Sequence, residues 1–484
     1  MSLLARQSLK FSIISYFSFV VGTLANIILY PLDWTFAGKL QSVVAYAELI
    51  YPFVLLGLSA SLVKFYPLLK ERNQQKSYFN FSFLMVTLCT FLVVLGYVVF
   101  QKQFETSQFA ESAYFIFAIV LFYAFNELFT KQSANLERIA IPSVFNGLFP
   151  RLGIITAFCL YFFAKVSPLV CLTVLSGAYM LSFLGNAFYV NRLDTIKPSF
   201  SFPFLEDKVF RKELFQYSLF AFLVNVGYAW SYRIDKALIN EYIDSQSVAL
   251  YGTFLAMLTA INIPTNGVYA ISSPLISKYL NNNDISALQK MYQENSLRLF
   301  ILGSLLFCMI GAGAVPLFSI MKNSEKLLES QSILYILGFS TLFDIATGFN
   351  SVVISFSKYY KINLLMLLVL MVLTIVCNLL FLRVFDMGIT GVAWATFISM
   401  FVFNIVKSIF IYKKFKIQPF TKEYIAVSLM IITSLLAVYY LPNFKFMILN
   451  FYKSGVVLLI FIAINAVMPV VSVKEILKPL FKKK

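Results

Sequence analysis

A few ionisable side chains lie inside long apolar segments of this 484-residue chain. A charge in the interior of a membrane is costly, so such residues usually face a cavity and serve a function. Arg151 directly follows Pro150 in one segment, and a guanidinium stays charged when buried and binds phosphate oxygens in pairs. Arg151 therefore predicts a contact with an anionic, phosphate-bearing group. The alternative is a tie between helices, either to Asp344 or to backbone carbonyls that the proline frees.

Asp344 and Glu48 are acids in such segments. A buried carboxylate can hold a coupling cation or a proton, so Asp344 predicts ion coupling to Na⁺ or H⁺. A pair with Arg151, or a neutral acid within a hydrogen bond, remains an open alternative for Asp344. Glu48 predicts a cation-binding or cavity-lining role, with an interfacial or paired carboxylate as its alternative.

Further charges mark the ends of apolar segments. Arg233 and Asp235, with Lys236 beside them, predict an outer gate or a headgroup contact, although charges at a helix end also sit comfortably at the membrane interface. Lys64 and Lys278 end two other segments and predict reception of a diphosphate at the cytoplasmic mouth. The excess of lysine and arginine in cytoplasmic loops explains the same two lysines without a site.

Several classes of chemistry have no support in the sequence. There are no histidines, so metal sites and proton relays built on histidine are excluded. The five cysteines form no CxxC pair, and no GxGxxG, Walker A or HExxH motif is present. We therefore predict a non-enzyme without a metal or other cofactor, and keep a membrane-embedded glycosyltransferase or ligase as an alternative. The net charge of +17 is dispersed over loops, which argues against nucleic-acid binding.

The elements that position these residues are membrane helices. The chain is 60% hydrophobic and 13% charged, whereas soluble domains carry roughly 25% charged residues. Its apolar residues fall in blocks long enough for a helix to cross the hydrocarbon layer, and they lack the alternation of a membrane barrel. The fold class predicted is all-α with about 14 transmembrane helices, over residues 11–31, 41–61, 79–100, 112–130, 141–164, 168–190, 214–232, 248–271, 296–320, 332–356, 361–383, 389–412, 423–441 and 450–470.

Charge sets the predicted orientation. With the N-terminus inside and the sides alternating, most lysines and arginines fall in inner loops, as expected for a cytoplasmic membrane protein. Both termini are then cytoplasmic. The rich inner segments are residues 64–76, 192–212, 407–422 and 474–484.

The order of the segments predicts two lobes and a tail. The charged segment 191–213 joins a first six-helix lobe (1–190) to a second (214–412), and residues 413–484 add two helices and a basic tail. An even number of helices in each lobe predicts a parallel repeat. Short matches support it: QSVVAYA at 41–47 pairs with QSVALYG at 246–252, and SLVKFY at 61–66 pairs with LISKY at 275–279.

Three stretches carry a resemblance to a known family. They are LGLSASLVKFYP at 56–67, YRIDKALI at 232–239 and SPLISKY at 273–279. With the layout of fourteen segments, they resemble the polysaccharide flippase family (O-antigen or oligosaccharide-lipid translocases) of the multidrug/oligosaccharidyl-lipid/polysaccharide exporter superfamily. The chain departs from the family at the turn after the first segment, where only Gly38 and Tyr46 of a Gly-Pro-Glu-x-Tyr-Gly pattern remain.

The resemblance implies a function and partners. The implied activity moves a polyprenyl diphosphate-linked oligosaccharide from the inner to the outer leaflet of the bacterial cytoplasmic membrane by alternating access, for lipopolysaccharide or exopolysaccharide synthesis. It also implies work alongside membrane lipids, a polysaccharide polymerase and glycosyltransferases. The alternatives are a cation-coupled multidrug antiporter of the same superfamily and a flippase for the peptidoglycan precursor. The second is disfavoured because the first segment has no charge between Lys10 and Asp33.

Overall fold

The computed structural model describes residues 3–468. The basic tail predicted at 474–484, and the last residues of the final predicted segment, lie outside this range. The chain forms two compact units, residues 1–253 and 254–484. The predicted repeat, with its boundary at 191–213, stays a prediction, because compactness does not test common ancestry.

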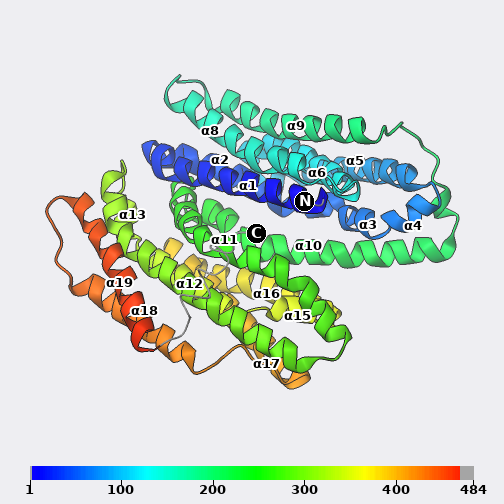
Figure 1. The fold of residues 1–484 in the computed structure, drawn as a ribbon. Helices are drawn as coiled ribbons and strands as arrows, with labels where there is room; N and C mark the ends of the chain where they lie inside the picture. Colours follow the sequence, from blue (N-terminus) through cyan, green and yellow to red (C-terminus); the bar gives the residue numbers. More distant parts are fainter. Residues whose placement is uncertain (1–2, 469–484) are drawn as a thin grey trace. The chain divides into compact units, whose positions relative to one another are not determined.

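The first unit is a bundle of long helices that run alongside one another (Figure 1). Short 3₁₀ or π segments continue several of them, at Ala25–Leu29 (η1), Tyr30–Leu32 (η2) and Val144–Leu148 (η5). The α-helices are α1 (Leu3–Leu24), α2 (Trp34–Leu55), α3 (Leu58–Lys64), α4 (Tyr66–Glu71), α5 (Gln75–Val99), α6 (Ala113–Asn135), α7 (Ala140–Ser143), α8 (Phe149–Phe162), α9 (Pro168–Leu193), α10 (Lys208–Tyr242) and the start of α11 (Ser245–Asn281).

Polar side chains fix how the helices of this unit face each other. The α6 helix packs against α9, and the π segment η5 lies beside α9. Asn126 donates to Asn146 at 2.6 Å and to Ser182 at 2.8 Å, and Ser182 donates to the carbonyl of Phe145 at 2.7 Å. Hydrogen bonds between membrane helices set their register, and side chains of this kind satisfy backbone groups that a helix irregularity frees.

A bend joins α2 to α3. Pro52 has no N–H to give to the carbonyl one turn earlier, and the chain then turns through Leu56 (φ +46°) and Gly57 (φ +74°). The two helices meet at 55°. A Cβ on Gly57 would lie 2.1 Å from the carbonyl oxygen of Ser218 on α10, so only glycine fits this crossing.

The segment 191–213 lies along the ends of α4 and α5. Lys76 pairs with Asp194 at 2.6 Å, and Asn80 donates to the carbonyl of Lys197 at 2.9 Å. Further along, Arg72 pairs with Asp207 at 3.1 Å. The predicted linker is thus held to its own unit by charged and polar contacts.

The second unit contains the rest of α11 and the helices that follow it (Figure 1). These are α12 (Ile285–Ile320), α13 (Glu325–Glu329), α14 (Ser332–Thr347), α15 (Asn350–Phe356), α16 (Tyr360–Leu379), α17 (Gly388–Phe415), α18 (Glu423–Tyr440) and α19 (Tyr452–Val467). The α14 helix packs against α12 and α17, and α12 packs against α18 and α19. A second bend, of 45°, separates α14 from α15.

The all-helical, multi-span fold predicted from the sequence is confirmed. In residues 3–468, eleven helices are long and apolar enough to cross a membrane, or thirteen if each bent pair, α2–α3 and α14–α15, forms one span. The difference from the predicted fourteen is α10, which covers the segment 214–232 but is missing from this set. Its last three turns hold Arg233, Asp235, Lys236 and Glu241.

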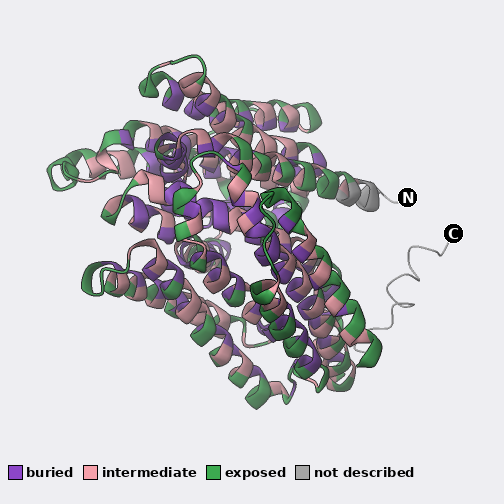
Figure 2. Cartoon of the chain, turned by 90° about the vertical axis from the view of Figure 1, so that its left-hand side faces the viewer, coloured by how far each residue is buried: buried purple, intermediate pink, exposed green. Residues whose placement is uncertain are grey.

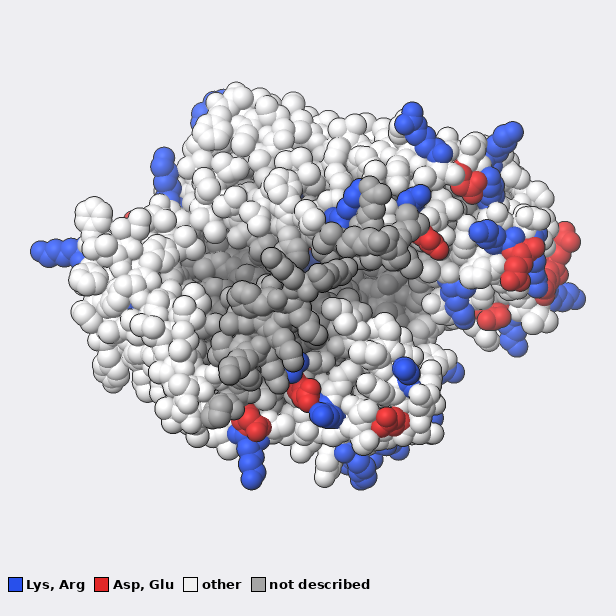
Figure 3. Space-filling view, in the orientation of Figure 1, with Lys and Arg blue, Asp and Glu red and all other residues white. Residues whose placement is uncertain are grey.

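The surface agrees with a membrane setting. Exposed residues follow the outward faces of the helices and buried ones lie inside each bundle (Figure 2). Many exposed residues are large and apolar, such as Phe91 at 61% and Ile462 at 58% exposure. In Figure 3 charged side chains gather at the right-hand end, over α3, α4 and the beginning of α10, and uncharged surface covers much of the remaining face. The protein is a multi-pass membrane protein.

Candidate functional site

An ion pair marks the interior of the first unit. The Nε of Arg233 on α10 lies 3.1 Å from Oε2 of Glu48 on α2. The two helices pack together, and the indole nitrogen of Trp230 donates to the carbonyl of Leu49 at 3.1 Å, which fixes their register. The Arg233 side chain is 51% exposed and that of Glu48 25%, so a polar ligand can reach both. Glu48 is thus a paired carboxylate, which was the alternative to a cation-binding role.

Tyrosines surround this ion pair. Tyr51 on α2 meets Tyr123 on α6 edge to face, with ring centroids 4.7 Å apart, and Tyr123 meets Tyr179 on α9 at 6.1 Å. Each of these three rings has Glu48 among its electrostatic neighbours. Tyrosine presents an aromatic face and a hydroxyl that donates or accepts. Nothing in the sequence distinguishes these three rings among the 28 tyrosines.

Arg151 lies in the same part of the unit. It is near the start of α8, directly after the π segment η5, and its Cδ and Nε lie against Gly22 of α1, where a Cβ would be 3.1 Å from both atoms. Its electrostatic neighbours are Tyr30 and Tyr179. Tyr179 also has Arg233 and Glu48 among its electrostatic neighbours, so the charges of both arginines reach this ring.

Arg151 differs from Arg233 in its pairing. Among the described residues Arg233 has a carboxylate partner, whereas no ion pair forms at Arg151. A half-buried guanidinium without a carboxylate presents its donor fork to an anion. Its role as a diphosphate contact stays a prediction, and the absence of a carboxylate partner among the described residues is consistent with it.

Asp235 and Lys236 point away from this cluster into helix contacts. The Tyr251 hydroxyl donates to the Asp235 carboxylate at 2.8 Å, and Lys236 donates to Gln41 at 2.9 Å. Asp235 is only 7% exposed. Gln41 and Tyr251 belong to the two similar motifs at 41–47 and 246–252, so α10 joins these motifs directly.

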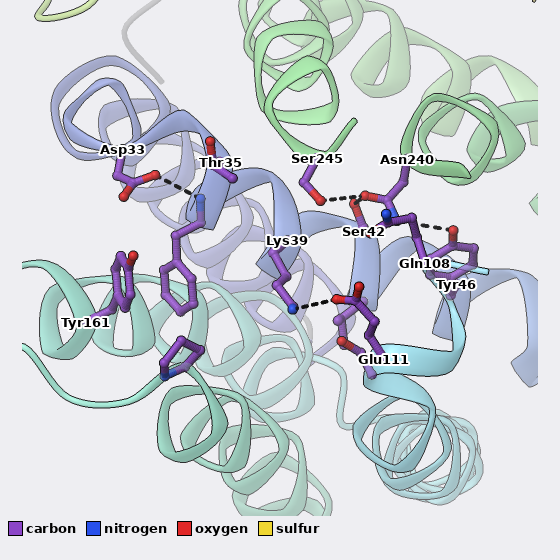
Figure 4. Close-up of a pocket in the computed structure, with 14 residues that line it drawn as sticks. Asp33, Thr35, Lys39, Ser42, Tyr46, Gln108, Glu111, Tyr161, Asn240 and Ser245 are labelled. Carbon is purple, nitrogen blue, oxygen red and sulfur yellow. Dashed lines mark hydrogen bonds and ion pairs between the residues drawn. The ribbon is translucent and has the colours of Figure 1, made fainter. Parts of the chain in front are cut away.

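A separate cavity of about 380 Å³ opens at the end of the first unit where α2, α9 and α11 begin. Lys39 and Glu111 form a 3.0 Å ion pair at its edge, and Ser42 and Ser245 both donate to Asn240, at 2.9 and 2.8 Å (Figure 4). The aromatic wall is Phe36 stacked on Tyr161 at 3.8 Å. Hydroxyls, amides and an aromatic face are groups that suit a sugar. By the predicted orientation this end is the outer one.

The two lysines predicted at the inner mouth have surroundings that differ from those of the tyrosine cluster. Lys64 ends α3, pairs with Glu213 at 3.6 Å, and lies 4.0 Å from the ring centroid of Tyr217. Lys278 is an exposed residue in the last turn of α11. Their role in receiving a diphosphate stays a prediction.

Asp344 has its own surroundings in the second unit. Asn404 on α17 donates to its carboxylate at 3.0 Å, and Lys407, one turn further along the same helix, is close enough for its charge to interact. Lys407 is only 2% exposed. Neither partner was predicted from the sequence: Lys407 falls both in the predicted helix 389–412 and in the basic inner segment 407–422, and α17 continues to Phe415. The spacing of Asn404 and Lys407, which share a helix face, is the signal that could have found them.

No protein-family model matches this chain, and no curated protein sequence does. Solved structures do match. The lipid II flippase MurJ in an inward closed conformation is similar with a TM-score of 0.70 and 16% identity, over 94% of this chain and 98% of that one. An inward-facing multidrug resistance MATE family transporter of the MOP superfamily has a TM-score of 0.62 and 12% identity, over 82% and 94%. A MATE transporter from Vibrio cholerae has a TM-score of 0.55 and 12% identity, over 86% and 98%.

This chain has the fold of MOP-superfamily transporters. The match spans nearly the whole chain and shows the fold. Membership of that superfamily, and of the polysaccharide flippases within it, stays a prediction.

Proposed function

We propose that the protein moves a lipid diphosphate-linked oligosaccharide from the inner to the outer leaflet of a bacterial cytoplasmic membrane. The observation that carries the proposal is Tyr179, which has Arg151, Arg233 and Glu48 among its electrostatic neighbours. Two guanidiniums therefore act on one aromatic ring of the first unit. Such a site suits the phosphates of a lipid-linked sugar, because arginine binds phosphate through paired hydrogen bonds.

The surrounding rings supply the rest of the recognition. Tyr51 and Tyr123 add aromatic faces and hydroxyls, which suit the rings and hydroxyls of a sugar. The cavity at Lys39 and Glu111 offers a second polar surface at the predicted outer end. We infer that the phosphates are held at the arginines while the sugar contacts the tyrosines, and that the lipid tail stays in the bilayer.

The transport step proposed is alternating access without catalysis. Two of the similar solved structures are a flippase and a transporter. We propose that both termini are cytoplasmic, that an ion gradient of Na⁺ or H⁺ drives the cycle, and that polysaccharide polymerases and glycosyltransferases act before and after it.

A multidrug antiporter is the second candidate, favoured by the MATE structures. Its cationic substrates would meet Arg151 and Arg233 in the first unit, where Glu48 is already paired with Arg233, which disfavours their binding by charge. The lipid II chemistry of the flippase MurJ fits the arginines as well as a polysaccharide precursor does. The experiment therefore has to separate three substrates.

The test is deletion of the gene in its host, with quantification of surface polysaccharide, peptidoglycan precursor and cell-associated lipid-linked oligosaccharide. Wild type, Arg151→Ala and Arg233→Ala are returned on plasmids. The matched control is Arg192→Ala, an exposed arginine near the end of α9 that lies over the Phe188 ring. We expect completed lipid-linked oligosaccharide to accumulate in the deletion strain and in both site variants, and the control to complement fully.

Each other outcome identifies a different function. Accumulation of lipid II alone would make the protein a peptidoglycan-precursor flippase. Unchanged lipid pools with new sensitivity to cationic drugs would support the antiporter. Full complementation by both site variants, at normal membrane levels, would remove the arginine site from the mechanism.

A further inference from the structure

The break between α14 and α15 exposes the end of a helix inside the second unit. The α14 helix ends at Thr347, Gly348 has a φ of +68°, and α15 begins at Asn350. The last carbonyls of any helix lack partners within it, and they form the negative end of its dipole. Broken membrane helices use such ends, together with acidic side chains, to bind cations in secondary transporters.

The carbonyls at this break already have donors from the chain. Three tyrosine hydroxyls, from three different helices, donate to three consecutive residues. They are Tyr424 of α18 to Ala346 at 3.1 Å, Tyr292 of α12 to Thr347 at 2.7 Å, and Tyr269 of α11 to Gly348 at 2.9 Å. The helix end is therefore satisfied by side chains rather than by a bound ion.

The negative charge at the break also has a positive partner from the chain. Asp344, in the last turn of α14, faces Lys407 of α17 and accepts a hydrogen bond from Asn404. Lys407 is fully enclosed at 2% exposure. Its Nζ lies 2.5 Å from Oγ of Ser351 on α15 and 3.7 Å from the ring centroid of Phe403. The ammonium thus contacts the helix on the far side of the break and interacts electrostatically with the acid before it.

A lysine in such a place needs an explanation. A fully buried ammonium loses its hydration, and proteins tolerate it only where it is paired and hydrogen-bonded. The Lys407 ammonium contacts the Ser351 hydroxyl directly and interacts electrostatically with the Asp344 carboxylate. Hydroxyls and carboxylates are among the oxygen ligands that hard metal cations take.

We propose that Lys407 is a tethered cation, whose ammonium takes the position of a sodium ion at the broken helix of the second unit. The chain has then closed this cation site from within, so Na⁺ does not bind at Asp344 in the wild-type protein. Removal of the ammonium leaves the carboxylate and the hydroxyl facing a cavity, and creates a sodium site there. The proposal concerns the ion and is independent of which substrate the first unit carries.

The test uses the full-length protein purified in detergent, and follows thermal unfolding in NaCl or choline chloride at equal ionic strength. The variants are Lys407→Ala, Asp344→Asn and the double variant, with Lys453→Ala as the matched control. Lys453 is another buried lysine, 7% exposed, which donates to Asn443 at 2.8 Å and to the carbonyl of Val438 at 3.0 Å. A ligand that binds only the folded state raises its melting temperature in a concentration-dependent way.

We expect wild type to melt at the same temperature in both salts. Lys407→Ala should melt lower in choline chloride and recover by a few degrees in NaCl, with saturation and with a preference among Li⁺, Na⁺ and K⁺. The double variant, in which no charge remains at the site, and Lys453→Ala should show no sodium response. A sodium response in wild type that Asp344→Asn removes would overturn the proposal, as would a folded Lys407→Ala protein without one.

If Lys407→Ala does not fold, Lys407→Gln fills more of the cavity and keeps the test open. Binding of radioactive ²²Na⁺ to the wild-type protein decides the matter independently. Stoichiometric binding that is lost in Asp344→Asn contradicts the tethered cation, and its absence supports it. Because none of these measurements uses a lipid substrate, failure here is distinct from failure of the proposed flipping activity.

Discussion

Arg233 of α10 and Glu48 of α2 form an ion pair in the first unit, with 3.1 Å between Nε and Oε2. The guanidinium that we assign to a substrate phosphate is therefore already neutralised by the chain. A phosphate that binds Arg233 has to displace the carboxylate, and release of the phosphate allows the pair to re-form. The pair therefore weakens phosphate binding, because the carboxylate competes with the substrate for the same donors.

Glu48→Gln removes this competition without changing the size of the side chain. We expect a water-soluble, short-chain polyprenyl diphosphate sugar to bind about fivefold tighter, which corresponds to ~1 kcal/mol for a partly exposed ion pair. Transport should become slower because release is impaired. Titration calorimetry and a flipping assay in proteoliposomes measure the two effects. The matched control is Glu127→Gln, which breaks the neighbouring ion pair with Lys131 on α6; weaker or unchanged binding in Glu48→Gln would contradict the model.

Arg151→Lys tests the shape of the cation separately from its charge. Lysine keeps the charge but loses the planar fork that binds two phosphate oxygens at once. We expect transport to fall about tenfold, in line with the loss of one charge-assisted hydrogen bond, and to fall further in Arg151→Ala. Protein levels should stay near normal, since Arg151 has no ion pair among the described residues. Arg192→Lys is the control, and equal transport by Arg151→Lys and wild type would exclude a bidentate role.

The membrane helices could be predicted from the sequence because each is marked by a local run of apolar residues. Each predicted segment corresponds to a helix, or to a bent pair of helices, in residues 3–468. The α10 helix is more polar than the other long helices of the first unit. Its apolar segment 214–232 is part of a single 35-residue helix that has charged residues at both ends. Those charges include Arg233, so the least apolar long helix of the first unit is the one that brings a cation to the site.

The pairing within the site could not be predicted in the same way. Glu48 and Arg233 stood out singly because each is a charge at or inside an apolar segment, but their contact depends on the packing of α2 against α10. Lys407 was missed for a different reason. It lies near the end of the predicted helix 389–412, where the basic residues that follow indicate the membrane surface, and only the packing of α17 shows that its side chain is buried.

The contacts of Asp207, in the segment that joins α9 to α10, predict that the stability of the folded protein falls at acid pH. Its carboxylate accepts from the backbone nitrogens of Phe210 and Val209 at 3.0 Å and pairs with Arg72. These hydrogen bonds, the one from Phe210 first, lower the pKa of Asp207 below its ordinary value of 3.8. A lowered folded-state pKa means that the cap stabilises the protein above the unfolded-state pKa, and that this contribution is lost as the pH falls through the folded-state value.

The measurement is the melting temperature of wild type and Asp207→Asn between pH 7 and pH 3. We expect the variant to melt lower at pH 7 and to lose less on acidification below pH 4, because it has no carboxylate to protonate. Glu206→Gln, a change at the neighbouring exposed acid, should follow wild type. Parallel curves for wild type and Asp207→Asn over this range would show that the cap carries none of the acid sensitivity.

Gly57→Ala tests the bend that sets α3 against α10. Gly57 has a φ of +74°, and a Cβ there would meet the carbonyl oxygen of Ser218 at 2.1 Å. Alanine therefore combines an unfavourable backbone conformation with a clash against the backbone of α10, a helix that is packed against α2 and α3. We expect a loss of about 3 kcal/mol, seen as a lower melting temperature and reduced membrane abundance. Gly96→Ala is the control, because a Cβ at that helical position meets nothing within 4 Å, and alanine favours the helix. Equal stability of the two variants would show that the α2–α3 bend is free to rearrange, and the fixed position of Glu48 one turn before Pro52 would then need another cause.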